Sequence, residues 1–463
     1  MPLPTIPSGN VASALPSGYD VDNSCRFNRA DSPYMHITPG GDGDLRKFTV
    51  SFWCKRGTLT TGSGTGRQVI FSTATNDAIT FDGSNDKFAF LEDGGDALVT
   101  NRVFRDCSAW YHIVVAVDTE QGVAANRIKL YVNGVLETSF STTCQTSQDA
   151  DMGFGKGSEM MSVGRSEYDD NRHFDGYLAE FYYINNSQLA ASDFGEFDED
   201  SPTIWKPKDA SGLTFGTNGF YLDFEDSSNL GNDANGGTDL TEVNLAAADS
   251  ATDTPTNNFA TLNPLDNYYA GGTFSEGNCT YVTASEPYAQ IKSTFNVSKG
   301  KWFWEVKNVD GTATMIGASG ATVVDATHGV GLPTASCAYY IDGRKVIGNV
   351  LTSYGTSYTD NDIIGVALNL DDDEITFYKN GTAQNSGTAI SIVAAASAPN
   401  GGYSPAVSDE SNDTTQTLQC NFGGCPAFAI SSGNSDADGY GNFEYAVPSG
   451  YYSLCTKNLA EYG

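Results

Sequence analysis

Long apolar runs are missing from this sequence of 463 residues. No stretch approaches the roughly 20 consecutive apolar residues that a membrane-spanning helix needs. The start, Met1–Pro4, also lacks a basic region followed by an apolar run, so we expect no signal peptide. Both absences predict a chain that does not insert into a membrane.

Basic residues are scarce as well. The chain has 25 Lys and Arg against 57 Asp and Glu, a formal net charge of -32 at pH 7. Such an excess of negative charge repels phosphate backbones and anionic membrane surfaces. We therefore expect no nucleic-acid partner, and we interpret the acidity as a surface that keeps a β-rich protein soluble.

Motifs for catalysis and for zinc are also lacking. The four histidines lie far apart, and no Gly-x-Ser-x-Gly elbow or phosphate-binding Gly-Lys-Ser/Thr loop occurs. The nine cysteines contain no Cys-x-x-Cys pair, so we expect most of them to be small buried apolar residues. Only Cys420 and Cys425 are close enough in sequence to suggest a disulfide.

Helical periodicity is nearly absent, whereas short alternating runs bounded by Gly, Asn and Asp recur throughout. Trp110–Asp118 is apolar on both faces, which is typical of an inner strand. Ile128–Val132 leads into Asn133–Gly134, the pair best suited to a two-residue hairpin turn. In the second half, Lys301–Val306 alternates and Asn380–Gly381 marks another hairpin. The sequence predicts an all-β protein.

Between the halves, residues 226–262 are rich in Asp, Asn, Thr and Gly and poor in aromatics, which favours a linker. A length of 463 residues suits two or three domains. We therefore predict two antiparallel β-sandwiches in tandem, over residues 1–225 and 263–463.

The first half carries a family resemblance in five segments: Ser24–Asn28, Phe48–Arg56, Phe104–His112, Lys129–Gly134 and Phe174–Glu180. Their order and spacing resemble the laminin-G-like, concanavalin A-like jelly-roll sandwiches encoded by tailed phages, particularly marine ones. The resemblance covers most of residues 20–225. It implies a jelly-roll sandwich that binds through its end loops or a concave face.

The second half carries a different set of motifs: Gly300–Val306, Tyr340–Gly343, Asp362–Leu368, Ile375–Gly381 and Tyr403–Val407. These resemble a SPRY sandwich, the module also called B30.2. The pairing of both modules resembles phage virion proteins such as tail fibres, appendages or capsid decorations.

One acidic string has the composition of a catalytic motif. Concanavalin A-like glycosidases carry Glu-x-Asp-x-Glu on an inner strand, where alternate carboxyl groups face one sugar bond. Here the string is Glu196–Asp200, its last residue is aspartate, and Pro202 follows closely. We interpret it as a solvated acidic loop. For His112, which lies in the predicted inner strand, we expect a hydrogen-bonded core histidine.

The loop Gly164–Phe174 has more chemical variety than any other loop of the first half. Sugar recognition needs an aromatic ring and polar groups for hydroxyls. Tyr168, Asn171 and His173 supply both, which makes them candidate glycan ligands.

The same loop offers carboxylates, the ligands that Ca²⁺ prefers on loops. The candidate ligands are Asp169, Asp170 and Asp175. Asp82–Asp86 offers similar chemistry. For each cluster a plain turn remains an alternative, because Asp, Asn and Gly are also typical β-turn residues.

The resemblance implies a virion protein on the particle exterior, and the lack of catalytic motifs favours a non-enzymatic one. We expect it to contact other capsid or tail components, to be present in many copies or as a homo-oligomer, and to attach to host cell-surface polysaccharide. Three alternatives stay open: a polysaccharide-degrading enzyme of the same fold, an architectural decoration without a ligand, and a eukaryotic cell-surface adhesion protein.

Overall fold

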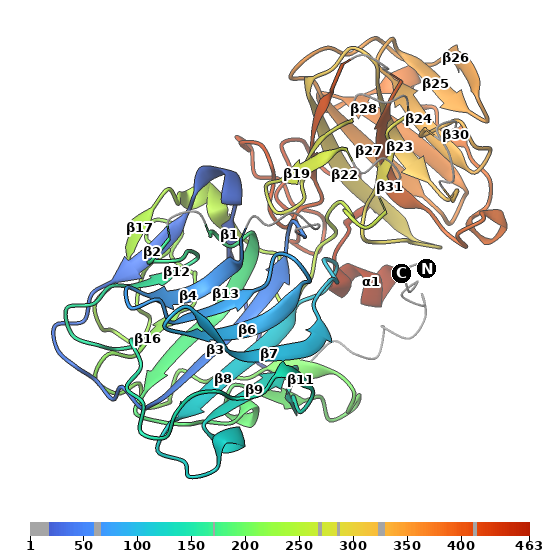
Figure 1. Ribbon diagram of the computed structural model, residues 1–463. Coiled ribbons are helices and arrows are strands. Elements are labelled where there is room, and N and C mark those ends of the chain that lie inside the picture. Colours follow the sequence, from blue (N-terminus) through green and yellow to red (C-terminus); the bar gives the residue numbers. More distant parts are fainter. Residues whose placement is uncertain are drawn as a thin grey trace. The chain divides into compact units, whose positions relative to one another are not determined.

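The computed structural model describes residues 18–59, 66–169, 172–266, 271–284, 288–322, 329–410 and 414–463. Strands make up 39% of the chain and helices 6%, which confirms the all-β prediction. The described residues up to Thr256 form one compact unit and those from Asn257 onward form another (Figure 1). In the described ranges, no helix is long and apolar enough to cross a bilayer.

The first unit is a sandwich of two eight-stranded antiparallel sheets. The β3 sheet has the order β10 (Val135–Leu136), β9 (Ile128–Val132), β8 (Tyr111–Asp118), β3 (Lys47–Arg56), β13 (Gly176–Asn185), β1 (Ser24–Phe27) and β18 (Ser250–Ala251), with β16 (Phe220–Leu222) also on β13. The β4 sheet has the order β11 (Phe140–Thr142), β7 (Gly95–Val103), β6 (Lys87–Glu92), β5 (Ala78–Phe81), β4 (Gln68–Thr73), β12 (Met161–Val163), β2 (Tyr34–Ile37) and β17 (Thr241–Val243). A separate pair is formed by β14 (Gly195–Phe197) and β15 (Trp205–Pro207).

Aromatic side chains fill the space between the two main sheets. Phe52 of β3 stacks on Phe181 of β13 at 5.7 Å between ring centroids, and Phe71 of β4 meets Phe181 edge-on at 5.5 Å. All three are fully buried. Burying one such ring contributes about 1.5–3 kcal/mol, so this layer is what holds the sheets together.

His112 lies on the opposite face of the β3 sheet, stacked between Trp53 and Trp205. The indole N–H of Trp205 donates to His112 Nδ1 at 2.9 Å, so the ring proton is on Nε2, which lies 2.9 Å from Ser51 Oγ. Burial lowers the pKa of His112 to about 3. The prediction of a core histidine is confirmed.

The second unit is also a sandwich. Its β22 sheet has the order β19 (Thr273–Ser275), β20 (Thr280–Val282), β32 (Thr417–Asn421), β22 (Lys301–Asp310), β27 (Ile363–Asn369), β28 (Glu374–Lys379) and β29 (Thr382–Ala383), with β30 (Ile390–Ser391) on β28 and β33 (Tyr452–Ser453) on β22. Its β23 sheet has the order β21 (Ile291–Lys292), β31 (Ser404–Asp409), β23 (Thr314–Ser319), β24 (Ser336–Tyr340), β25 (Arg344–Ile347) and β26 (Val350–Ser353). Among the described residues one α-helix occurs, α1 (Thr456–Tyr462).

Both Asn-Gly hairpins are confirmed. Asn133 and Gly134 have φ values of 46° and 78°, and Asn380 and Gly381 have 47° and 75°. Two positive φ values in succession define the turn whose twist matches the flanking strands. The buried pair Trp302 and Trp304 packs in the second core, as their alternation predicts.

All nine cysteines are free, including Cys420 and Cys425. Eight are buried and Cys144 is half-buried. Burial raises the pKa of the Cys54 thiol to about 12, so it is a packing residue and not a reactive thiolate.

The predicted linker over 226–262 is wrong. Its strand β17 pairs with β2, and β18 pairs with β1, so both main sheets of the first unit gain a strand from this segment. Asp253 forms an ion pair with Lys55 Nζ at 2.7 Å, with side chains 2% and 1% exposed, and accepts a hydrogen bond from Trp110 Nε1 at 3.1 Å. The division between the units therefore lies after Thr256. Polar contacts and two core leucines, Leu230 and Leu240, hold this segment, which is too few apolar residues to produce a periodic pattern.

Glu180 occupies an unusual backbone position in the middle of β13. Its φ is +49°, and the register of β13 against β3 shifts at this point, as in a β-bulge. Three tyrosine hydroxyls donate to its carboxylate: Tyr182 at 2.5 Å, Tyr221 at 2.8 Å and Tyr19 at 3.3 Å. Burial raises the pKa of Glu180 to about 7.

We predict that Asp253→Ala destabilises the first unit by about 3–5 kcal/mol, because the ammonium group of Lys55 would be left buried without its carboxylate. The measurement is urea unfolding followed by tryptophan fluorescence. Asp96→Ala removes the exposed partner of Arg67 and serves as control, with an expected loss of about 0–1 kcal/mol. Equal effects of the two substitutions would contradict the integration of residues 226–256 into this sandwich.

A second prediction concerns pH. Because the folded pKa of Glu180 lies above its ordinary value of 4.5, its contribution to stability is complete below about pH 4.5 and is lost as the pH rises through about 7. The difference in unfolding free energy between the wild type and Glu180→Gln should therefore change by about 3 kcal/mol between about pH 4.5 and pH 8, in favour of the variant at high pH. A difference that does not change with pH would show that this carboxyl is not perturbed.

Candidate functional site

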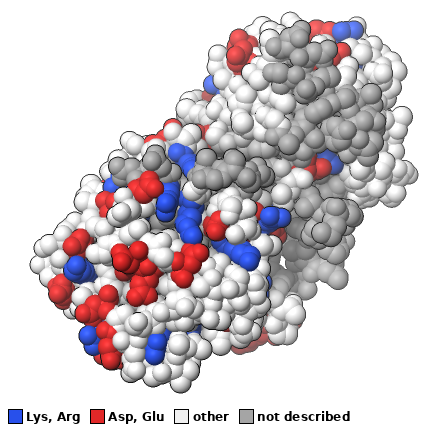
Figure 2. All heavy atoms as spheres, in the orientation of Figure 1, with Lys and Arg blue, Asp and Glu red and all other residues white. Residues whose placement is uncertain are grey.

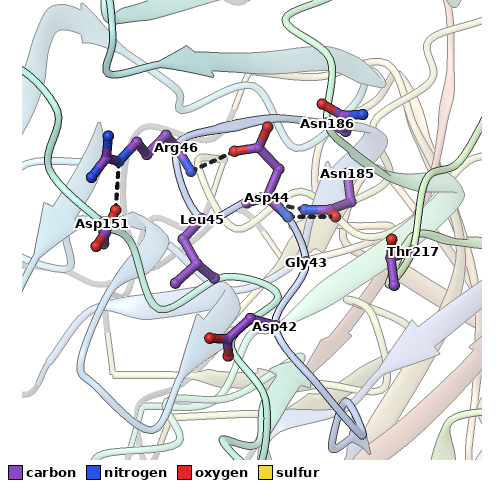
Figure 3. Close-up of a pocket in the computed structure, with 9 residues that line it drawn as sticks. All are labelled: Asp42, Gly43, Asp44, Leu45, Arg46, Asp151, Asn185, Asn186 and Thr217. Atoms are coloured by element: carbon purple, nitrogen blue, oxygen red, sulfur yellow. Dashed lines mark hydrogen bonds and ion pairs between the residues drawn. The ribbon is translucent and has the colours of Figure 1, made fainter.

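An open pocket of about 510 Å³ lies at one end of the first sandwich. It is formed where β3 begins and β13 ends, together with the loops that precede β12 and β16. Its lining is polar except for one leucine (Figure 3): Asp42, Gly43, Asp44, Leu45, Arg46, Asp151, Asn185, Asn186 and Thr217.

The buried side chain of Asn185 fixes the loop that forms one wall of this pocket. Its Oδ1 accepts the backbone N–H of Asp44 at 2.9 Å, and its Nδ2 donates to the carbonyl of Asp44 at 2.9 Å (Figure 3). A Cβ on Gly43 would lie 2.3 Å from Asn185 Oδ1, so only glycine fits between them. The wall is therefore set by the fold before any ligand arrives.

The carboxylates of the pocket are held by hydrogen bonds that leave room for a ligand. Asp44 Oδ1 accepts the backbone N–H groups of Arg46 at 2.9 Å and Lys47 at 3.0 Å. Asp42 Oδ1 accepts the N–H of Gly157 at 2.7 Å. In both cases the bonds that are present use Oδ1, and the second oxygen remains available for a hydroxyl or amine donor.

Arg46 is the single basic residue of the lining. Its Nε lies 2.6 Å from Asp151 Oδ1, and its terminal nitrogen lies 3.9 Å from Asp149. The hydrogen bond to Asp151 raises the pKa of Arg46. The guanidinium is therefore cationic, and it is already paired with a carboxylate of the pocket.

The loop predicted to bind a glycan, Gly164–Phe174, lies at the other end of the sandwich, where β13 begins at Gly176. Tyr168 is 68% exposed there, in keeping with a role in recognition. His173 is buried, and Asn171 lies outside the described residues. Of the two described residues of this set, Tyr168 is therefore on the surface and His173 is not.

The predicted cation ligands are also divided. Asp169 lies 3.3 Å from Arg172 Nε, whereas Asp175 is buried and accepts the N–H groups of Thr58 at 3.0 Å and Arg29 at 3.4 Å. Burial raises the pKa of Asp175. Asp170 lies outside the described residues. Among the residues that are described, no group of three His, Cys, Asp or Glu side chains is arranged to hold a metal ion.

Two other acidic strings have structural roles. Asp82 Oδ1 accepts both the N–H and the hydroxyl of Ser84, and buried Asp86 pairs with Arg56 at 3.1 Å and Arg105 at 2.8 Å. The string Asp82–Asp86 is thus a turn that ion pairs hold in place.

The string Glu196–Asp200 lies on and after the short strand β14, outside both main sheets. Lys206 Nζ lies 3.5 Å from Glu196 and 3.3 Å from Asp198, so the two carboxylates share one ammonium group. This arrangement differs from the inner strand that glycosidases of this fold use.

The pocket itself was not predicted from the sequence. Its residues come from four separate segments, none of which contains a recognisable motif. The only local signal is Asp42–Asp44 with a central glycine directly before a strand, which is equally typical of a turn.

Comparison with protein families finds one match in each half of the chain. Residues 29–191 match the Laminin_G_3 model, described as the concanavalin A-like lectin/glucanases superfamily. Residues 301–424 match the SPRY domain model. Both matched ranges lie within the two sandwiches described above.

Similar curated proteins share only part of the chain. The ATP-dependent RNA helicase DDX1 of Xenopus laevis is 28% identical over 120 residues, which cover 26% of this chain and 16% of that protein. The E3 ubiquitin-protein ligase RKP of Arabidopsis thaliana is 31% identical over 142 residues, which cover 30% of this chain and 10% of that protein. The chain thus spans a small part of the length of these relatives.

Two solved structures are similar at low identity. The SPRY domain of human HERC1 is 17% identical, with a TM-score of 0.27, covering 34% of this chain and 94% of that one. Stonustoxin is 16% identical, with a TM-score of 0.28, covering 35% of this chain and 27% of that one. From the family matches and the sheet topology, this chain carries a concanavalin A-like domain of the Laminin_G_3 type followed by a SPRY domain.

Proposed function

We propose that this chain is a non-enzymatic attachment protein on the exterior of a phage particle, and that its first domain binds host cell-surface polysaccharide in the pocket around Asp44 and Asn185. The observation that carries the proposal is the polar lining of this pocket, held in place by the hydrogen bonds of Asn185. A volume of about 510 Å³ falls in the range of small-molecule sites.

Sugar hydroxyls both donate and accept hydrogen bonds, so a sugar site needs both kinds of partner. The pocket supplies acceptors in Asp42 and Asp44, and amide and hydroxyl groups in Asn186 and Thr217. Because the wall is fixed in advance, binding costs little ordering of the loop. No aromatic ring lines the pocket, so recognition rests on hydrogen bonds.

The non-enzymatic part of the proposal rests on how the carboxylates are engaged. A glycosidase needs one carboxyl group that stays protonated and a second that is ionised across the scissile bond. Here Asp42 and Asp44 accept backbone N–H groups, and Asp151 pairs with Arg46. Each of these carboxylates thus serves as a hydrogen-bond or ion-pair acceptor within the fold, which supports a role in binding.

The virion assignment rests on the tandem of a concanavalin A-like and a SPRY domain, the pairing that resembles phage appendage and decoration proteins. The proposed partners are other capsid or tail components. A protein carried in many copies on a particle gains avidity from weak single sites, which suits a shallow polar pocket.

The direct test blocks the pocket. Thr217 is an exposed lining residue, so Thr217→Trp should fill the pocket without disturbing the core and lower binding to an array of bacterial cell-surface polysaccharides about tenfold or more. Val135→Trp, at an exposed site towards the other end of the sandwich, is the matched control and should bind like the wild type. Loss of binding in Tyr168→Ala but not in Thr217→Trp would move the site to the loop Gly164–Phe174.

The enzymatic alternative has its own test. Incubation of the purified chain with the polysaccharide that it binds should release no reducing ends above the level of a heat-denatured control. Sustained release would overturn the non-enzymatic assignment and would identify a polysaccharide-degrading enzyme. If no array member is bound by the intact chain, the architectural alternative replaces the attachment function.

A further inference from the structure

The pocket carries a strong local excess of negative charge. Three carboxylates line it, those of Asp42, Asp44 and Asp151, against the one guanidinium of Arg46. Asp149 adds a fourth carboxylate 3.9 Å from that guanidinium. The pocket therefore lies in a local negative field. On the face of the first unit shown in Figure 2, acidic and basic side chains each gather in groups.

Arg46 does not offset this field for a ligand. Its Nε is bonded to Asp151 at 2.6 Å, and an anionic ligand would have to replace that carboxylate to reach the guanidinium. Like charges about 4–6 Å apart repel even in water, and this repulsion acts from several carboxylates at once. An ammonium group in the same place would instead be attracted.

We infer that the pocket selects neutral and amino sugars and rejects uronic and other acidic sugars. The inference rests on the proposed function, because it names the ligand class of the same site. Neutral sugars bind through their hydroxyls to the amide and carboxylate groups, and amino sugars gain a charge-assisted hydrogen bond in addition. Acidic sugars meet repulsion that no free cation of the lining offsets.

The negative charge of the pocket can be removed without loss of the hydrogen bonds that hold the loop. Asp42 and Asp44 each use Oδ1 to accept backbone N–H groups, and asparagine keeps that oxygen. The triple variant Asp42→Asn, Asp44→Asn, Asp151→Asn should therefore keep the loop in place. It removes the carboxylate that Arg46 contacts at 2.6 Å and leaves Asp149 as its remaining acidic neighbour, so the negative excess of the pocket is abolished.

A matched control changes the net charge of the chain by the same amount elsewhere. Asp106, Asp209 and Asp226 are exposed turn residues whose Oδ1 accepts the N–H and hydroxyl of the serine two positions on. Their replacement by asparagine preserves these turns. None of the three lines the pocket.

The probes are oligomers of glucosamine, N-acetylglucosamine and glucuronate, measured by calorimetry with the full chain at about 0.02 M and about 0.5 M salt. We expect the wild type and the control triple variant to bind glucosamine best and glucuronate at least about tenfold more weakly, with the gap narrowing at high salt. The pocket triple variant should lose this preference and bind the three sugars about equally.

Two results would overturn the inference, and they are distinguishable. If the wild type binds glucuronate as well as the other sugars, or if the pocket triple variant keeps the wild-type order, the charge of the pocket does not select the ligand, and the attachment function stands. If none of the three sugars and no polysaccharide of the array is bound, the proposed function fails and the inference fails with it. A circular dichroism spectrum and melting temperature equal to the wild type verify that each variant is folded.

Discussion

The side-chain amide of Asn185 is the interaction on which the pocket depends. Asn185 is the last residue of β13, which pairs with β3 as the longest pair of neighbouring strands in the first domain. Its side-chain amide both donates to and accepts from the backbone of Asp44. An amide can satisfy a backbone N–H and C=O at once, which neither a carboxylate nor a hydroxyl does with the same geometry. Strand β13 therefore fixes the position of the loop before β3, and with it the positions of the carboxylates of this loop.

The two ends of β13 have different physical characters. At its start, Asp175 points inward onto the N–H groups of Thr58 and Arg29, and the nearby Arg56 is buried against Asp86. These charged groups are thus engaged in hydrogen bonds and ion pairs inside the fold. At its end, near Asn185, the carboxylates are anchored through one oxygen and remain open to solvent. Because of this contrast we propose the binding site at the end of β13 near Asn185.

Much of the fold could be predicted from the sequence because it depends on local rules. Asn133–Gly134 specifies its hairpin through two residues that tolerate positive φ, and the alternation of Trp302 and Trp304 places both rings in one core. His112 was identified as a core residue because apolar residues flank it on both faces of the strand. These signals need no knowledge of the rest of the chain.

The remaining features depend on contacts between distant residues. The sequence predicts a linker over residues 226–262 because a contact that holds this segment, the ion pair of Asp253 with Lys55, joins residues 198 positions apart and leaves no apolar periodicity. The pocket was missed for the same reason, since Asp44 and Asn185 are 141 positions apart. Conversely, the composition of the loop around Tyr168 predicts a glycan site there. In the structure His173 is buried, so one of the predicted ligands is not on the surface.

The most direct measurement of the central claim is hydrogen exchange of the full chain with and without a bound polysaccharide from the array. We predict that the ligand protects the amides of residues 41–47, 151–157, 185–186 and 216–218, because these segments form the pocket and its supports. We expect no change in residues 164–169 or in the SPRY domain. Protection confined to residues 164–169, or to the second domain, would contradict it.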